Sequence, residues 1–323
     1  MKPFKSPLAD YLEQYVAYRR CLGYGEKKLR CDLRQFDRYV CVKNARLADL
    51  TSSFFLELKK DFREKQPSFN QLLLAARGLF AFMVRCQILA DNPLLDIAAY
   101  RQKAYIPFVF SADQTEQLLA AAAKHIRKDP RYFLADYGRY LAIVLMARCG
   151  LRISEPLRLK LSDYDKDRRS IYIGKTKFNK DRLLALPLAA CRPIDNYLAV
   201  RSRFVKTVNS YLICGKHDAG LRGNFVRKAF DQATANIGCN QPKRIIANTI
   251  FGRPTPHSLR HAFAINTLLK IKQHGRSPQQ ALPVLSAYLG HRKYRYTAVY
   301  LKVIDAQNRR QLVDFAISRQ EEL

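Results

Sequence analysis

A histidine and an arginine stand three residues apart in the stretch from Thr255 to Ala264. Pro256 fixes φ for a helix start, so His257 and Arg260 are predicted to share one face of the first turns of a helix. An arginine fork and an imidazole beside a helix N-terminus suit a phosphate oxygen. Taken alone, this motif also fits an ordinary surface pair.

A second arginine, Arg152, follows a long apolar segment that runs from residue 136 to residue 148. Gly150 is predicted to end that helix at a left-handed cap, which places Arg152 in a turn before a further helix. Glu155 stands three residues later and is the obvious partner of the arginine. The residues alone leave two interpretations open, a structural Arg–Glu pair and a phosphate-binding arginine.

A basic hairpin is predicted between these two motifs. The β-like runs 170–173 and 183–186 flank a tip that carries four basic residues: Lys175, Lys177, Lys180 and Arg182. A lysine on such a loop can reach a leaving group and give it a proton. The alternative is a basic hairpin that touches the DNA backbone.

The charge of the chain points to a polyanionic partner. The 323 residues contain 57 Lys and Arg against 27 Asp and Glu, a formal net charge of +30. Residues 1–103 carry a net +8 and residues 104–323 a net +22, so the excess is spread over the chain. Double-stranded DNA is the expected partner, through phosphate neutralisation and counterion release.

Hydrophobic periodicity predicts a mainly α protein with a small β-hairpin or sheet (α+β). Residues 1–103 are expected to form an all-helical DNA-binding domain, 104–110 a linker, and 111–323 a second domain of helices and the hairpin. Lys28 and Arg34 lie on the outward face of the second predicted helix and are candidate DNA contacts. A solvated basic face is the alternative.

The cysteines and acidic residues predict no metal site. The eight cysteines include no Cys-x-x-Cys pair, Cys214-x-x-His217 has no second half at zinc spacing, and Asp163, Asp165 and Asp167 are typical of a solvated turn. We expect buried, reduced thiols in a cytoplasmic protein. No run approaches eighteen apolar residues, so neither secretion nor a membrane partner is expected.

The order of these motifs resembles that of the tyrosine recombinase (phage integrase) family. Arg152, the lysine hairpin, His257-x-x-Arg260, Leu289-Gly290-His291 and Tyr300 follow one another at the spacing of that family's catalytic set. The resemblance covers the region from about Ser111 to Leu301. The hairpin and the segment 282–291 look most like recombinases of transposons and other mobile elements.

The resemblance implies a role for each matching residue. Tyr300 would attack a DNA phosphodiester and give a 3′-phosphotyrosine and a free 5′-hydroxyl. Arg152 and Arg260 would clamp the non-bridging oxygens, His257 would assist as acid or base, His291 would bind the phosphate, and Glu155 would orient an arginine. Lys177, five residues before Arg182, would protonate the leaving oxygen, with Lys175 and Lys180 as alternatives because Ala185 stands where many relatives have proline.

The resemblance therefore implies a site-specific DNA recombinase of a mobile element that needs no metal, ATP or other cofactor. It also implies a homotetramer on two DNA sites, with residues 305–320 as an exchanged helix; intramolecular packing of that helix is the alternative. A bacterial cytoplasmic location, with binding to the nucleoid, is expected. The competing functions are a chromosome-dimer resolvase and a non-catalytic DNA-binding accessory protein.

Overall fold

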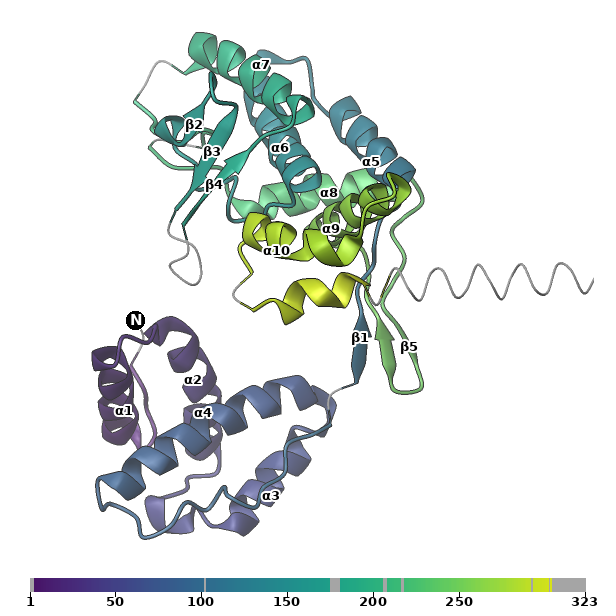
Figure 1. Ribbon diagram of the computed structural model, residues 1–323. Coiled ribbons are helices and arrows are strands. Elements are labelled where there is room, and N and C mark those ends of the chain that lie inside the picture. Colours follow the sequence, from purple (N-terminus) through teal and green to yellow (C-terminus); the bar gives the residue numbers. More distant parts are fainter. Residues whose placement is uncertain are drawn as a thin grey trace, which may run out of the picture. The chain divides into compact units, whose positions relative to one another are not determined.

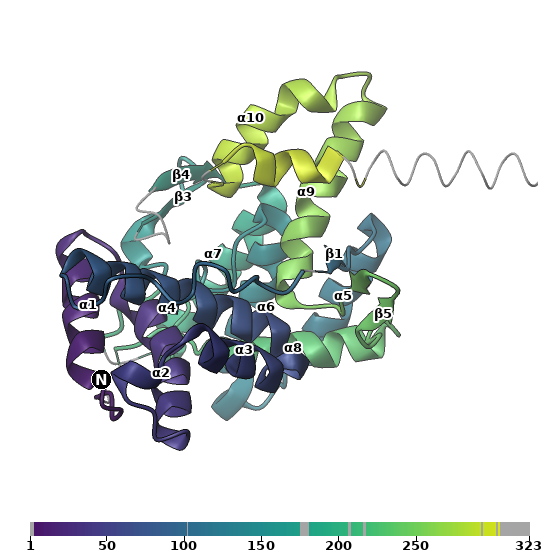
Figure 2. The ribbon, with the colours of Figure 1, turned by 90° about the horizontal axis from the view of Figure 1, so that it is seen from below.

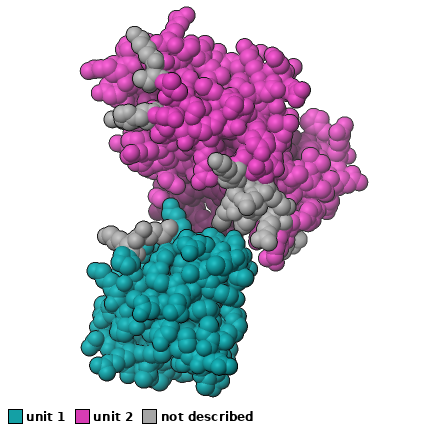
Figure 3. Space-filling view, turned by 90° about the vertical axis from the view of Figure 1, so that its left-hand side faces the viewer, with its two compact units in different colours: residues 1–103 teal, residues 104–323 magenta. Residues whose placement is uncertain are grey.

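The computed structural model describes residues 3–101, 103–174, 181–205, 208–215, 218–291, 293–301 and 303. The chain divides into two compact units, residues 1–103 and 104–323, which are coloured separately in Figure 3. Unit 1 consists of helices, whereas unit 2 combines helices with two small sheets. The predicted mainly α fold with a small β component is confirmed.

Unit 1 is built from helices (Figure 1). Its elements are α1 (Ala9–Cys21), α2 (Glu26–Val42), η1 (Leu47–Asp49), α3 (Ser52–Asp61), η2 (Arg63–Lys65) and α4 (Gln66–Arg85). The 3.6-residue period explains the packing: Leu33, Phe36 and Val40 of α2 fall on one face, and each is completely buried. Residues 93–96, which follow α4, form a turn.

Unit 2 is organised around α6 (Pro130–Cys149), whose residues 141–147 are all buried. The helices that contact it are α5 (Ala112–Lys124), α7 (Leu188–Phe204), α8 (Gly223–Asn236) and α9 (Pro256–Gln273). Asp129 caps α6 at its N-terminus through the backbone N–H of Arg131, and Pro130 occupies the first helical position. The long apolar segment, predicted to be helical, is therefore the centre of this unit.

Two small sheets complete unit 2. One is an antiparallel meander of β2 (Tyr164–Asp165), β3 (Ser170–Ile173) and β4 (Arg182–Ala185) next to η3 (Leu161–Asp163). In the other, β6 (Thr249–Phe251) pairs in antiparallel fashion with β5 (Arg244–Ile246) and in parallel with β1 (Ala104–Ile106). The first sheet contains the predicted hairpin strands.

Two local expectations differ from the structure. Residues 104–110 are not a free linker, because β1 pairs with β6 and Phe110 is completely buried in the core of unit 2. Residues 153–158 form turns and not a new helix. In this turn region the side chain of Glu155 accepts a hydrogen bond from the backbone N–H of Arg152, which favours a compact turn over a helical start.

The C-terminal part of unit 2 packs as a smaller cluster against α9. Figures 1 and 2 both show α10 (Pro278–Leu289) and the short helix at residues 295–301 beside α9. The contact is apolar: Ile265 and Leu268 of α9 lie with Leu289 and the ring of Tyr300. This cluster brings the Leu289-Gly290-His291 motif and Tyr300 next to the helix that carries His257 and Arg260.

The cysteines fall into two groups, which corrects the expectation of general burial. Those of unit 2 (Cys149, Cys191, Cys214 and Cys239) are buried, whereas those of unit 1 (Cys21, Cys31, Cys41 and Cys86) are exposed. Cys21, Cys31 and Cys41 lie on the solvent-facing sides of α1 and α2, and Cys86 directly follows the end of α4.

Candidate active site

The site begins where α6 ends. Gly150 terminates the helix in a left-handed conformation, with φ 61°. A side chain there is excluded, since a Cβ atom would lie 2.6 Å from Cδ1 of Phe263. The carbonyl oxygen of Gly150 accepts a hydrogen bond of 2.7 Å from Nη1 of Arg260. The predicted cap therefore also anchors the arginine of the His-x-x-Arg motif.

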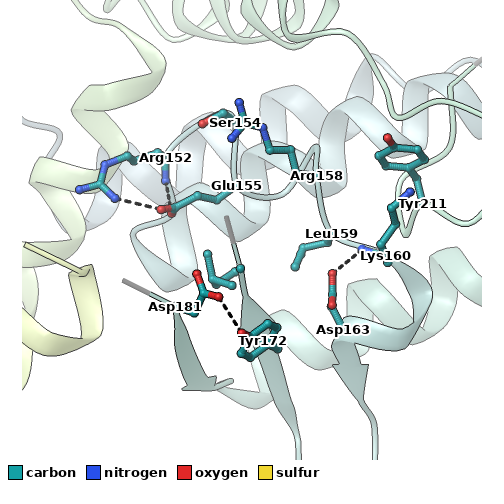
Figure 4. A pocket seen from close by; sticks show the side chains of 12 residues that line it. Arg152, Ser154, Glu155, Arg158, Leu159, Lys160, Asp163, Tyr172, Asp181 and Tyr211 are labelled. Carbon is teal, nitrogen blue, oxygen red and sulfur yellow. Dashed lines mark hydrogen bonds and ion pairs between the residues drawn. The ribbon is translucent and has the colours of Figure 1, made fainter. Parts of the chain in front are cut away.

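Glu155 is the centre of an arginine cluster. Its carboxylate accepts hydrogen bonds from Nη1 of Arg152 at 2.9 Å and from Nη1 and Nη2 of Arg182 at 3.2 and 3.0 Å. Nη1 of Arg260 lies 4.0 Å away. Only 8% of Glu155 is exposed, so three guanidinium groups surround one buried carboxylate. Figure 4 shows Arg152 pointing toward Glu155.

The negative charge of Glu155 and the positive charges of the arginines stabilise one another. Burial alone raises the pKa of Glu155, but the hydrogen bonds and charges of Arg182, together with the charge of Arg260, outweigh it and leave the pKa below its ordinary 4.5. Burial and the nearby charge of Arg152 lower the pKa of Arg260 to about 9, so its guanidinium stays charged at neutral pH. The cluster carries a net positive charge that an anion can neutralise.

Arg260 lies inside the protein, with 1% of its surface exposed. Besides Gly150 it donates to the carbonyl oxygen of Leu289 through Nη2. Thr255 and Ser258 form a capping box at the start of α9, and Pro256 follows the cap, which fixes the first turn that carries His257. His257 is exposed in that turn, one helical turn before the inward-pointing Arg260.

The end of α10 supplies the next group. Gly290 ends the helix in a left-handed conformation with φ 64°, and its carbonyl oxygen lies 3.3 Å from Nη2 of Arg152. His291 follows directly, and its Nδ1 lies 2.8 Å from the hydroxyl of Thr297. Burial and the positive charges of Arg260 and Arg152 lower the pKa of His291 to about 3, so the ring is neutral at physiological pH.

Tyr300 lies beside these histidines. Its side chain is 5% exposed, and its ring centroid is 6.3 Å from that of His291. Burial raises the pKa of Tyr300 above 10.0, while the charges of Arg260 and Arg152 act in the opposite direction. By contrast, Tyr294 and Tyr296 are 51% and 48% exposed. Of these three tyrosines, Tyr300 is the one that lies among the charged groups of the site.

One residue of the site was missed by the sequence analysis. Nδ1 of His261 lies 3.1 Å from the hydroxyl oxygen of Tyr300. The ring of His261 also packs edge-on against that of His257, with centroids 4.7 Å apart. The available signal was the spacing, because His261 follows His257 by four residues and therefore lies on the same helix face.

The hairpin is only partly described. Lys175, Lys177 and Lys180 lie outside the described residues, so their candidate roles stay predictions. Arg182, expected as a DNA contact, is instead largely buried: besides binding Glu155, it donates to the carbonyl oxygen of Tyr288 at 2.9 Å. In unit 1, Lys28 is exposed and paired with Asp32, and Arg34 is half-buried.

Arg152 also lines a cavity of about 790 Å³ (Figure 4). Arg158 and Lys160 line it, and the ammonium group of Lys160 lies 3.4 Å from the ring centroid of Tyr211. Asp163 and Asp181 also line the cavity but are engaged, with the backbone of Lys160 and the hydroxyl of Tyr172 respectively. The cavity thus extends from Arg152 with a lining that contains three basic and three acidic side chains.

The described residues contain no cluster of three or more His, Cys, Asp or Glu side chains that could hold a metal ion. Within the same part of the chain, no helix is both long enough and apolar enough to cross a membrane.

Fold and site together define an α+β protein with a buried tyrosine beside two arginines and three histidines. The sequence profile described as the phage integrase family matches residues 109–307. The chain belongs to this family, the tyrosine recombinases. It is therefore a DNA strand-transferring enzyme of site-specific recombination, as its sequence motifs predicted.

Individual relatives agree with this assignment. The chain is 27% identical to y4rB of Sinorhizobium fredii, described as an integrase/recombinase, over 92% of this chain and 93% of the relative. It is 25% identical to tyrosine recombinase XerD of Rickettsia bellii, over 91% and 92%. Its fold resembles a lambda integrase tetramer bound to a Holliday junction, with a TM-score of 0.67, 16% identity, and coverage of 91% of this chain and 76% of that one.

Proposed function

We propose that Tyr300 is the nucleophile of a site-specific recombinase that cuts and rejoins DNA through a 3′-phosphotyrosine. The phenolic oxygen attacks the phosphorus atom, and the bond to the 5′-oxygen breaks. The observation that carries the proposal is the position of Tyr300 within the charged field of Arg260 and Arg152. A tyrosine needs such a field, and a proton acceptor, to react near neutrality.

The arginines stabilise the pentavalent transition state. Arg152 is 27% exposed and reaches the scissile phosphate while Glu155 holds its guanidinium in place. Arg260 is anchored by two backbone carbonyl oxygens, so it acts as a fixed positive charge and donates its remaining N–H groups to the phosphate. Positioning and electrostatics of this kind carry most of phosphoryl-transfer catalysis.

The histidines and the hairpin lysine donate hydrogen bonds to the phosphate and transfer protons during the reaction. His291 donates to a non-bridging oxygen through the ring nitrogen that does not contact Thr297. His257 exchanges protons from its exposed position at the start of α9. Lys177, on the hairpin between β3 and β4, protonates the leaving 5′-oxygen, with Lys175 and Lys180 as alternatives.

DNA is the proposed substrate of the whole chain. Residues 1–103 form a DNA-binding domain of helices in which Lys28 and Arg34 are candidate contacts, and residues 111–323 form the catalytic domain. Arg158 and Lys160 bind phosphates next to the scissile one, since their cavity adjoins Arg152. The reaction needs neither metal nor ATP, because arginines neutralise the phosphate and the phosphotyrosine conserves the energy of the broken bond.

The biological role that we propose is integration, excision or transposition of a mobile element, carried out by a tetramer on two DNA sites in the bacterial cytoplasm. The similarity to the S. fredii integrase/recombinase y4rB supports it. Chromosome-dimer resolution is the second candidate, because the similarity to XerD is almost as high. The predicted helix at residues 305–320 lies outside the described residues, and its exchange between subunits belongs to the proposed assembly.

The decisive experiment uses a suicide DNA substrate, nicked close to the cleavage position, whose sequence is taken from the DNA that flanks the gene. The wild-type protein and Tyr300→Phe are incubated with it in EDTA, and the products are separated on a denaturing gel. A covalent protein–DNA adduct is expected from the wild type alone. An adduct that persists in Tyr300→Phe moves the nucleophile to another tyrosine, with Tyr294 and Tyr296 as the next to test.

Specific binding of both proteins without any adduct would instead support the DNA-binding accessory function. The control for folding is the affinity for the same DNA, which Tyr300→Phe is expected to retain.

A further inference from the structure

The hydroxyl group of Tyr300 has a partner that the family motif does not name. Nδ1 of His261 lies 3.1 Å from the phenolic oxygen, and the two rings meet at an interplanar angle of 62° with centroids 5.7 Å apart. His261 lies on α9, and Tyr300 lies on the helix at residues 295–301. The hydrogen bond therefore joins two elements that the apolar cluster around Leu268 already holds together.

This contact lies inside the site. Tyr300 is 5% exposed and His261 is half-buried, so little water surrounds the hydrogen bond. The ring of His257 covers one edge of His261, with centroids 4.7 Å apart. Because both partners are fixed by packing, the phenolic oxygen is held in one position relative to α9 and to the arginine that α9 carries.

We propose that His261 orients the hydroxyl group of Tyr300 and receives its proton when the tyrosine attacks DNA. This inference rests on the proposed function, in which Tyr300 is the nucleophile. As the bond from the phenolic oxygen to phosphorus forms, the O–H bond breaks and the proton moves to Nδ1 of His261. The bond from phosphorus to the 5′-oxygen breaks, and that oxygen takes a proton from the hairpin lysine.

The protonation state of His261 suits this role. The charged and titratable groups around it are His257 and Arg260 of α9, Tyr300 of the facing helix, and His291 after α10. Burial, His257 and Arg260 lower the pKa of His261 to about 4, so the ring is neutral at pH 7 and can accept a proton at Nδ1. A bound phosphodiester brings a negative charge that raises the pKa again, which makes the ring a stronger base when substrate is present.

The step reverses during rejoining. The free 5′-hydroxyl gives its proton back to the hairpin lysine and attacks the phosphotyrosine. The bond from phosphorus to the phenolic oxygen breaks, and His261 returns its proton to that oxygen. His257 remains free to exchange protons with the phosphate and with solvent from its exposed position. The two histidines of α9 thus serve different atoms, although they stand one turn apart.

Two substitutions separate orientation from proton transfer. His261→Asn places an amide atom near the position of Nδ1 and keeps a hydrogen bond to Tyr300, but the amide cannot take a proton. His261→Leu removes both properties at similar size. Adduct formation on the suicide substrate is measured in single turnover with protein in excess, and affinity for an uncut duplex is measured in parallel.

His261→Asn is expected to form the adduct about 100-fold more slowly than the wild type, the effect of losing a positioned base, and His261→Leu more slowly still because orientation is lost as well. DNA affinity is expected to stay unchanged. In His261→Asn the rate is expected to rise steadily with pH, because solvent hydroxide then takes the proton. If His261→Asn cleaves as fast as the wild type, the proposed proton transfer is wrong; this variant also decides the question should His261→Leu fail to fold.

A substrate with sulfur in place of the bridging 5′-oxygen identifies the side of the reaction on which His261 acts. A thiolate leaves without protonation, so this substrate relieves the loss of a proton donor but not the loss of a base. The defect of His261→Asn is expected to persist with the sulfur substrate. A full rescue would overturn the proposal, whereas the absence of any adduct from the wild type would count against the proposed function itself.

Discussion

The arginine cluster around Glu155 and the segment that carries Tyr300 belong to one site, but different contacts hold them. Glu155 and Arg260 are almost fully buried, and Arg260 donates hydrogen bonds to backbone carbonyl oxygens at the ends of α6 and α10. The ring of Tyr300 is equally buried, yet its hydroxyl group meets a histidine side chain. The cluster is thus part of the core of the protein, whereas a hydrogen bond to one side chain positions the nucleophilic oxygen.

This difference fits the chemistry. Charge stabilisation works best from groups that do not move during the reaction. A nucleophile, by contrast, has to exchange a hydrogen bond for a bond to phosphorus. Substitutions in the arginine cluster are therefore expected to cost much folding stability as well as activity, and substitutions of the Tyr300 hydroxyl to cost activity with little loss of stability.

Glu155→Gln is the strongest test of this contrast. Removing the buried carboxylate charge leaves three guanidinium groups without it, so we expect the free energy of unfolding to fall by about 3–5 kcal/mol in urea titrations. The matched control is Glu57→Gln, because Glu57 is 53% exposed and pairs with Lys43 at the surface. That control should change by less than about 1 kcal/mol. Equal losses in the two variants would show that the cluster does not stabilise the fold.

The same carboxylate predicts a pH dependence of stability. The pKa of Glu155 is lowered in the folded protein, so its stabilising contribution is complete above the ordinary value of 4.5 and is lost as the pH falls through the folded value. The difference in unfolding free energy between wild type and Glu155→Gln should be constant from pH 7 to pH 5. It should shrink in stronger acid, as urea titrations across that range would reveal.

Gly150→Ala tests the backbone that anchors Arg260. A Cβ atom at this left-handed position would meet Phe263 at 2.6 Å and Leu289 at 2.9 Å, and such overpacking costs about 1–3 kcal/mol. Gly238→Ala is the control, since Gly238 also has a positive φ, of 66°, but would meet no atom within 4 Å. Thermal unfolding should show the larger loss in Gly150→Ala, which should also cleave more slowly. A larger loss at Gly238 would contradict this account.

Tyr300→Phe should have the smallest effect on the fold. The ring stays in its apolar cluster, and one hydrogen bond to His261 is lost, which is worth about 0.5–1.5 kcal/mol. We expect the midpoint of thermal unfolding to change little while adduct formation stops. A loss as large as that of Glu155→Gln would mean that Tyr300 is as much a part of the core as the cluster is.

The sequence predicts those parts of the molecule that depend on local periodicity or on a fixed order of motifs. Leu33, Phe36 and Val40 follow the period of the second predicted helix, whose outward face was assigned to Lys28 and Arg34, and all three are buried. The helix α6 and the strands β3 and β4 were also predicted correctly, because each has a local pattern of apolar residues in the sequence.

The parts that escaped prediction depend on partners far away in the sequence. β1, β5 and β6 have three residues each, all of them exposed or half-buried, so they show no alternation of apolar and polar residues. β1 pairs with β6, and more than half of the second unit separates the two strands in the sequence. The side chain of Arg182 appeared to be one more basic residue of a hairpin, but its carbonyl partner lies 106 residues away. The contact between His261 and Tyr300 likewise spans 39 residues.

The distribution of cysteines gives the chain a built-in labelling pattern. The exposed thiols of Cys21, Cys31, Cys41 and Cys86 all belong to unit 1. The thiols of unit 2 are enclosed, and burial raises the pKa of Cys149 to about 12, which keeps it protonated and unreactive. A maleimide dye will therefore mark the helical unit and leave the catalytic one untouched, so fluorescence can follow unit 1 on DNA. The same exposure makes a reducing agent necessary during purification, since air oxidation would link molecules through these four positions.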